Sequence, residues 1–529
     1  MKTDKLLLGL TFVVLISASA ARAQEKLGQV RFPVSCTAAA QQEFDRAVAL
    51  LHSFWFDASA KAFAAVTQMD PGCGMGHWGS AMTLLGNPLA APPTPKALQE
   101  GWAAVERAKI AGAKTARERE YIAAIEAFYK DSDKLDHRTR ALAYEKAMES
   151  LLRRSPEDED KEAAVFYALA LNITALPTDK TYANQLKAAE ILERVFAEQP
   201  NHPGVAHYLI HSYDYPPIAS RGLSAARRYA SIAPSAPHAL HMPSHIFTRR
   251  GFWIESIESN RASAAAARNH FDQLHAMDYL AYAYLQMAQD LTARRVLDEA
   301  IAIQKINVEH FVPGYALAAI PARYTLERSR WADTASLSLP ASDFPWSRYP
   351  QAEAVFVFAR ALGAARSGNA AGARKDIARL EVLRDALIAA KQGYWAEQVE
   401  IQRQVAAAWV ARAEGKHQEA LQLLRAAADR EDATEKHPVT PGPIAPAREL
   451  LGEMLLELGD PRQALKEFET SHRVEPNRFK GLYGAARAAE LSGDREKART
   501  YYASLLALCE KADTERPELK EAKAFLAKK

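Results

Sequence analysis

The segment Arg448–Pro476, which reads RELLGEMLLELGDPRQALKEFETSHRVEP, is the most informative part of the sequence, because small and large apolar residues recur in it at fixed spacings. Three of its landmarks return at one constant spacing: Gly459 as Gly493, Ala464 as Ala498, and Phe468 as Tyr502. Small residues let two helices approach closely, a large apolar residue fills the seam between them, and glycine or proline ends a helix. The segment therefore predicts a pair of antiparallel helices that is repeated and stacked along the chain.

The spacing, about 34 residues, is typical of the tetratricopeptide (TPR) repeat. Residues of the segment fall on the repeat positions 7, 8, 11, 15, 20, 24 and 32, and they are Leu451, Gly452, Leu455, Gly459, Ala464, Phe468 and Pro476. Weaker copies lie upstream, around Gly415, Gly368 and Trp331, and another places Phe63 and Pro71 in register near the start. No strand pattern of useful length is present. We therefore expect an all-α, right-handed superhelical solenoid of TPR-type helical hairpins, with roughly nine or ten repeats.

The N-terminus has the features of a secretory signal. A basic region with Lys2 and Lys5 precedes the apolar run 6–16, and Ala21-Arg22-Ala23 supplies the small residues of a cleavage site. The run is too short to span a membrane comfortably, and no later stretch reaches that length. We expect residues 1–23 to be a signal peptide, and the protein to be periplasmic or secreted with no integral membrane segment after cleavage.

The charge balance argues against an anionic polymer as partner. The 529 residues contain 67 Lys plus Arg and 64 Asp plus Glu, which gives a net charge of +3, and removal of residues 1–23 reduces it to +1. We therefore expect no nucleic-acid partner. No glycine-rich phosphate loop and no nucleophile elbow is present, so the sequence favours a binding protein over an enzyme and leaves a metal-dependent reaction open.

Two of the three cysteines fit a disulfide. Cys36 lies just before the first helical pattern and Cys73 just after the second, so both lie at the same end of an antiparallel hairpin. In an oxidising compartment we expect Cys36 and Cys73 to be joined, which would clamp the first hairpin. Cys509 is expected to be a small buried residue.

Two irregular segments interrupt the repeats, a proline-rich loop at 86–98 and the stretch EDATEKHPVTPGPIAP at 431–446. A long loop can reach toward the binding face of a solenoid, but a passive insertion fits the sequence equally well. The expected divisions are N-terminal hairpins at 24–200, histidine-rich hairpins at 201–310, degenerate hairpins at 311–430, the long loop at 431–446 and C-terminal repeats at 447–529.

Histidines gather in the middle of the chain. Nine of the 15 lie between His202 and His310, and two pairs are spaced i, i+4: His207 with His211, and His241 with His245. The two pairs are one repeat length apart, so each shares a helix face and both occupy the same places in consecutive repeats. Met242-Pro243 interrupts the second pair and predicts a kink there.

These places are expected to face the concave groove. Counted from the repeat-ending Pro200 and Pro234, the pairs fall at positions 5 and 9, which line the groove in TPR proteins. The third repeat has two registers: a strict repeat spacing puts His275 at position 5, whereas its second helix puts His275 at 2, Asp278 at 5 and Tyr282 at 9, which we prefer. The residues expected in the groove are His207, His211, Asp214, His238, His241, His245, His275, Asp278 and Tyr282.

Two functions fit this groove. Adjacent first helices pack about 10 Å apart, so imidazoles can meet on one ion, and neutral imidazole with carboxylate suits zinc, copper, nickel or iron. The expected ligands are His207, His211, His241 and His245, with His238 or Asp278 in addition. The function that we prefer from the sequence, because repeat arrays generally have it, is a scaffold that binds a protein or peptide segment in the groove, and a metalloprotein or metal-dependent enzyme is the alternative. We expect His202, His270 and His310 at the surface, and Arg249 as a solvated charge at a helix end.

Longer stretches of the chain resemble exported bacterial TPR proteins that carry an H-M-P-x-H signature. The matching segments are HYLIHSYD from His207, HALHMPSHIFTRRG from His238, LHAMDYLAYAYLQ from Leu274, and FDRAVALLHSFWFDASAKAF with DPGCGMGHWG near the N-terminus. The resemblance implies a binding scaffold whose histidine groove is a feature of the group, and it implies no particular reaction.

Overall fold

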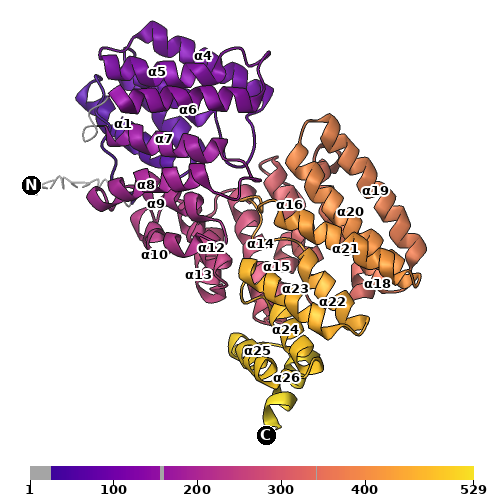
Figure 1. The fold of residues 1–529 in the computed structure, drawn as a ribbon. Helices are drawn as coiled ribbons and strands as arrows, with labels where there is room; N and C mark the ends of the chain where they lie inside the picture. The colour runs from indigo at the N-terminus through magenta and orange to yellow at the C-terminus, as the bar shows by residue number, and fades with distance from the viewer. Residues whose placement is uncertain (1–24, 155–159, 341, 529) are drawn as a thin grey trace, which may run out of the picture.

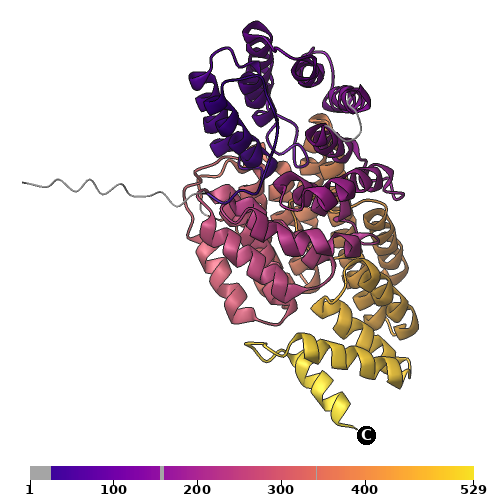
Figure 2. The ribbon, with the colours of Figure 1, turned by 90° about the vertical axis from the view of Figure 1, so that its left-hand side faces the viewer.

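The computed structural model describes residues 25–154, 160–340 and 342–528, and these residues form helices and no strand. The expected signal peptide at 1–23 lies outside the described residues. Consecutive helices pack as antiparallel hairpins, and the hairpins stack into a curved solenoid (Figures 1 and 2). The all-α solenoid predicted from the repeats is therefore confirmed.

The helices of the first half, in chain order, are α1 (Ala38–His52), α2 (Phe56–Met69), α3 (Gly74–Thr83), α4 (Pro95–Ala111), α5 (Ala116–Tyr129), α6 (His137–Arg154), α7 (Lys161–Thr174), α8 (Ala183–Glu198), α9 (Pro203–Tyr213), η1 (Ala219–Gly222), α10 (Leu223–Ile232), α11 (Pro237–His241), α12 (Pro243–Arg249) and α13 (Trp253–Ala266).

The helices of the second half are α14 (His270–Gln286), α15 (Asp290–Ile301), α16 (Phe311–Leu326), α17 (Trp331–Ala335), η2 (Trp346–Arg348), α18 (Pro350–Arg366), α19 (Ala370–Ala389), α20 (Gly393–Ala413), α21 (His417–Asp432), α22 (Ala447–Glu457), α23 (Pro461–Val474), α24 (Phe479–Leu491), α25 (Arg495–Leu508) and α26 (Pro517–Ala527).

The C-terminal repeats show why the opening pattern makes hairpins. The ring of Phe468 on α23 lies so close to Gly452 and Gly484 that a Cβ at either glycine would come within 2.7 and 2.3 Å of it. Gly459 and Gly493, between the helices of two successive hairpins, have φ angles of +81° and +83°, a conformation that favours glycine. Small residues thus create the room that the aromatic ring fills, as the spacing predicts.

A disulfide fastens the N-terminal end of the solenoid. The Cα atoms of Cys36 and Cys73 are 5.2 Å apart and their sulfur atoms are bonded. The bond links the residue before α1 to the residue before α3, so it encloses the first hairpin. Cys509 is a free, buried cysteine.

The solenoid closes on its own middle. Helix α24 contacts α14, the indole nitrogen of Trp253 donates to the carbonyl of Asn477 at 2.7 Å, and the guanidinium of Arg516 pairs with Asp290. Hairpins that are distant in the sequence are thus in direct contact. None of the helices in the described ranges combines the length and the hydropathy needed to cross a membrane.

The connection between α21 and α22, residues 433–446, forms a strap across the inner side of the solenoid. The ammonium group of Lys180 pairs with Glu435 at 2.7 Å, and the ring of His437 bonds the carbonyl of Ala90 at 2.9 Å. The strap contains four prolines, which cannot donate in a helix. The long loop is therefore not a passive insertion: it covers the surface where the sequence predicts an open groove.

Candidate metal centre

Six histidines from consecutive first helices converge beneath the strap. His207 and His211 come from α9, His238 and His241 from α11, His245 from α12 and His275 from α14. Each is at most 8% exposed. The six side chains expected to face the groove are thus buried, and of them His211 borders the cavity beside the strap.

The six side chains form two groups of three. The first group is His207, His211 and His238, and the second is His241, His245 and His275. Within each group, one nitrogen from every histidine lies within 4.8 Å of the others. The four ligands expected from the sequence do not meet in one group. Instead, each i, i+4 pair takes its third member from the neighbouring part of the array.

The two groups lie side by side. The ring centroids of His211 and His245 are 5.7 Å apart, and those of His238 and His241 are 5.9 Å apart. Adjacent repeats thus each contain a three-histidine group, and the rings of the two groups are in contact.

Hydrogen bonds fix the tautomers of the second pair. The Nδ1 atom of His241 lies 2.6 Å from Oδ1 of Asn260, whose amide nitrogen donates to the carbonyl of Ser256, so Oδ1 can only accept. The Nδ1 atom of His245 lies 2.9 Å from the carboxylate of Asp214, which also accepts. Both Nδ1 atoms therefore carry hydrogen, and in neutral rings both Nε2 atoms present lone pairs.

Those two lone pairs face each other. The Nε2 atoms of His241 and His245 are 3.1 Å apart, and either a proton shared between the rings or a metal ion would offset the repulsion of their lone pairs. A bound ion with metal–nitrogen bonds of about 2.0–2.1 Å would hold two nitrogens about 2.9 Å apart at a right angle and about 3.3 Å apart at a tetrahedral angle. The observed separation lies between these values.

In the first pair only the tautomer of His207 is fixed, so Nε2 of His211 can donate an ordinary hydrogen bond to it or share an ion with it. Nδ1 of His207 lies 2.6 Å from the carbonyl of His52, so it donates, and the Nε2 atom of a neutral His207 carries a lone pair. That Nε2 atom lies 3.1 Å from Nε2 of His211. The ring of His207 also stacks on Tyr229, with centroids 5.3 Å apart, which holds its orientation.

The third member of each group has a buried nitrogen with no hydrogen-bond partner among the described residues. These atoms are Nε2 of His238 and Nδ1 of His275. A buried polar atom without a partner costs about 1–3 kcal/mol, so such atoms are rare. Each group therefore combines two facing nitrogens with a third that is free to bind, which fits a metal ion in a three-histidine site.

Burial keeps the imidazoles neutral. It lowers the pKa of all six histidines, and the pKa values of His207 and His275 fall to about 3. Neutral imidazole is the form that binds metals, so near pH 7 the six rings are ready to act as ligands.

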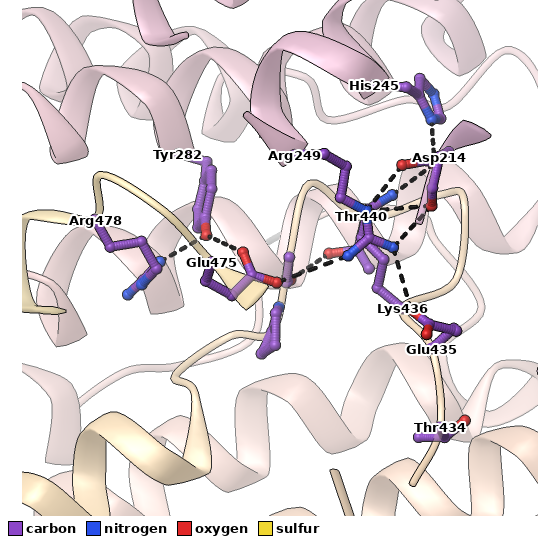
Figure 3. Close-up of polar contacts among 12 residues, drawn as sticks. Asp214, His245, Arg249, Tyr282, Thr434, Glu435, Lys436, Thr440, Glu475 and Arg478 are labelled. Atoms are coloured by element: carbon purple, nitrogen blue, oxygen red, sulfur yellow. Dashed lines mark hydrogen bonds and ion pairs between the residues drawn. The ribbon is translucent and has the colours of Figure 1, made fainter. Parts of the chain in front are cut away.

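Asp214 links the second group to the strap (Figure 3). Its Oδ2 atom accepts from His245 and, at 2.8 Å, from the ammonium group of Lys436, while Oδ1 accepts from Nε of Arg249 at 2.9 Å. Burial opposes ionisation of Asp214, but Lys436 and Arg249 outweigh it and hold its pKa well below the usual value. Asp214 was expected in the groove; it orients a histidine ligand and is not a member of either group. Arg249, expected in solvent, is buried beside it.

The strap is also anchored through its backbone. The hydroxyl of Tyr279 lies 3.2 Å from the carbonyls of both Pro438 and Thr440, and the guanidinium of Arg323 donates to the carbonyls of Gly442 and Pro443. These bonds satisfy carbonyls that a proline-rich segment cannot pair within itself. They hold the strap directly over the second group.

Two residues expected in the groove lie elsewhere. The carboxylate of Asp278 accepts from Nε of Arg323 at 2.9 Å, so it forms a buried ion pair and contacts neither group. The hydroxyl of Tyr282 accepts from Arg478 at 2.7 Å and lies 3.4 Å from a carboxylate oxygen of Glu475. Tyr282 thus belongs to the buried polar network next to the strap (Figure 3).

A third cluster, His52, Glu162 and His202, was missed from the sequence, where His202 was expected at the surface. Glu162 accepts from Nε2 of His52 at 3.0 Å and from Nε2 of His202 at 2.8 Å. The Nδ1 atoms accept from the Tyr208 hydroxyl and the Val205 amide. Every ring nitrogen has a partner, so this cluster is complete without an ion. The only signal in the sequence was the position of His202 before Pro203, typical of a helix cap.

Two cavities flank the strap. One of about 780 Å³ is bordered by His211, Asp214, Lys436 and His437, and it leads from solvent to the first histidine group. The other, of about 550 Å³, is bordered by Arg249, Glu435, Lys436 and Thr440 on the opposite side. Solutes thus have a route to the edge of the buried centre.

No protein-family model and no curated protein sequence matches the chain. Among solved structures, the chain is similar to the human IFIT1 dimer with m7Gppp-AAAA, at 13% identity over 82% of this chain and 90% of that one, with a TM-score of 0.40. It is also similar to the TPR domain of P58(IPK), at 12% identity over 93% and 100% with a TM-score of 0.20. The chain is also similar to the APC/C hetero-tetramer Cut9–Hcn1, at 11% identity over 93% of this chain and 97% of that one, with a TM-score of 0.28. These likenesses concern the helical-repeat fold.

Proposed function

We propose that this protein binds transition-metal ions in two adjacent three-histidine sites. The observation that carries the proposal is the pair of Nε2 atoms of His241 and His245, 3.1 Å apart with both Nδ1 atoms engaged as donors. Zinc, copper, nickel and iron are the ions whose chemistry suits neutral imidazole. The cluster of His52, Glu162 and His202 shows the contrast, because a buried histidine cluster that needs no ion satisfies all its nitrogens internally.

The proposal is tested by the number of ions each chain holds. Protein made without a histidine tag, stripped with a chelator and reloaded with copper or zinc, is expected to hold about two ions per chain by elemental analysis, since such sites fill near stoichiometrically. The variants His241→Gln and His207→Gln should each reduce this to about one. His417→Ala, which removes an exposed histidine at the start of α21, should leave it unchanged.

Two results would oppose the proposal. Fewer than about 0.1 ion per chain in the reloaded protein would remove it, because a buried three-histidine site holds its ion tightly. Equal metal contents in His241→Gln and the unchanged protein would show that the ions are bound elsewhere. Circular dichroism of each variant checks that the fold is retained.

A scaffold that binds a protein or peptide segment is the second proposal. It is supported by the strap itself, a non-helical segment whose backbone carbonyls accept from Tyr279 and Arg323. A partner there would have to displace residues 433–446. The metal measurement separates the two proposals, since a scaffold of this kind needs no stoichiometric ion.

We further propose that the protein is exported. The support is the sequence at 1–23 together with the disulfide between Cys36 and Cys73, because such bonds persist mainly in oxidising compartments.

A further inference from the structure

The ligands in both groups are uncharged. All six are imidazoles, and neither group contains a carboxylate or a thiolate. The nearest carboxylate, Asp214, bonds to His245 but is itself paired with Lys436 at 2.8 Å and Arg249 at 2.9 Å. Among the described residues, neither group therefore has an anionic ligand of its own.

Burial makes the charge of the ion decisive. The cost of moving an ion from water into a protein interior rises with the square of its charge, so a divalent ion costs about four times as much as a monovalent one. Buried divalent sites usually offset this cost with anionic ligands or with a bound hydroxide. All six histidines here are at most 8% exposed, so water offsets little of the cost.

Adjacency adds a second penalty of the same kind. Rings of the two groups have centroids only 5.7 and 5.9 Å apart, so two ions bound here would be close neighbours. Their mutual repulsion scales with the product of their charges, which is about four times larger for two divalent ions than for two monovalent ones. Lys436 lies on the same side, and its positive charge offsets the negative charge that Asp214 would otherwise place near the ions.

The number of ligands also favours a monovalent ion. Three neutral nitrogens at the corners of a triangle suit the trigonal coordination that monovalent copper accepts without a further ligand. With bonds of about 2.0 Å the three nitrogens would be about 3.5 Å apart, so each pair, now 3.1 Å apart, would open by about 0.4 Å and the third ring would move in by up to about 1.3 Å. Nε2 of His238 and Nδ1 of His275 have no hydrogen-bond partner among the described residues, so these two nitrogens lose no hydrogen bond on binding an ion.

We infer that the two three-histidine groups form one centre that holds a pair of monovalent copper ions in preference to divalent metals. The inference rests on the proposed function, which it deepens by naming the ion. It makes Lys436 and the neutral ligand set, and not the affinity order of divalent metals, the source of selectivity.

Competition under anaerobic conditions tests the inference. The stripped full-length protein is titrated with monovalent copper against a chromophoric chelator, and then challenged with a tenfold excess of zinc. We expect about two equivalents of copper to bind and zinc to displace less than a tenth of it. Displacement of most of the copper by zinc would overturn the inference while leaving the proposed function intact. Failure of both metals to bind would overturn both.

The substitution Lys436→Met gives a second measurement that does not depend on the absolute affinities. Loss of one nearby positive charge acts on an ion in proportion to the ion's charge, so the factor by which zinc affinity rises should be about the square of the factor for monovalent copper. Equal factors for the two metals, or no change for either, would contradict an electrostatic origin of selectivity. Lys391→Met, an exposed lysine at the rim of the larger cavity, is the matched control and should leave both affinities within twofold.

Discussion

At the scale of single residues, Asp214 is the side chain that connects the second histidine group to the strap. One of its carboxylate oxygens orients His245 and accepts from Lys436 of the strap, and the other accepts from Arg249. A carboxylate that accepts from a histidine ligand fixes the tautomer of that ligand and raises its basicity. Asp214 thus couples the second histidine group to the segment that covers it.

The substitution Asp214→Asn tests this role. The amide oxygen can still accept from Nδ1 of His245, but the negative charge that makes the ligand more basic is lost. We expect the affinity for one of the two ions to fall by about 10–100-fold while the other is unchanged, as measured by competition titration. Asp333→Asn, an exposed carboxylate beside Arg330, serves as the control. Equal losses at both ions, or none, would contradict a role confined to the second group.

The sequence predicted the histidine pairs and also named His238 and His275 as their neighbours, but it did not predict how the six divide into two groups. The i, i+4 spacing and its recurrence in the next repeat follow from helix geometry, so the pairs His207–His211 and His241–His245 could be found without a structure. The third members depend on how neighbouring helices rotate. Tyr282 illustrates the limit, because its repeat position was sound and yet its hydroxyl contacts Arg478 from a distant hairpin.

At the scale of elements, the strap is the segment that converts a groove into a buried site. Its two ends are fastened to each other, because a carboxylate oxygen of Glu431 at the end of α21 accepts from the backbone amide of Ala447 at the start of α22, at 2.8 Å. Burial raises the pKa of Glu431 to about 8. The carboxyl is therefore mostly protonated at pH 7, although a glutamate in an unfolded chain is ionised.

Glu431, beside the strap, should make the stability of the protein depend on pH. The pKa of Glu431 in the folded protein, about 8, lies above its value of about 4.3 in the unfolded chain, so the folded state binds the proton more tightly. This contribution to stability is fully present below about pH 4 and is lost as the pH rises through 8. We expect the melting temperature of the metal-free protein to fall between pH 5 and 8.5, and to fall less in Glu431→Gln.

Glu419→Gln is the control for this measurement, since Glu419 is an exposed glutamate on the same helix. Its melting temperature should follow that of the unchanged protein at every pH. If Glu431→Gln and the unchanged protein lose the same number of degrees over this range, Glu431 does not titrate as described.

At the scale of the whole molecule, closure of the solenoid buries the centre. Contacts such as Trp253 with Asn477, and Arg516 with Asp290, join hairpins that are far apart in the sequence. The repeat pattern reports only how each hairpin packs on the next one, which is why the solenoid could be predicted and its closure could not. The same reason explains why the long loop was seen in the sequence but its position over the histidines was not.

The position of the bound ions is the sharpest test of the two histidine sites. Crystals of the copper-loaded protein, measured at the copper absorption edge, should show two anomalous peaks per chain, one in each histidine group. Each peak should lie about 2.0–2.1 Å from nitrogens of three histidines: His207, His211 and His238 for one, and His241, His245 and His275 for the other. Copper peaks found only outside these two groups, or none in a protein that retains its fold, would contradict the proposed metal centre.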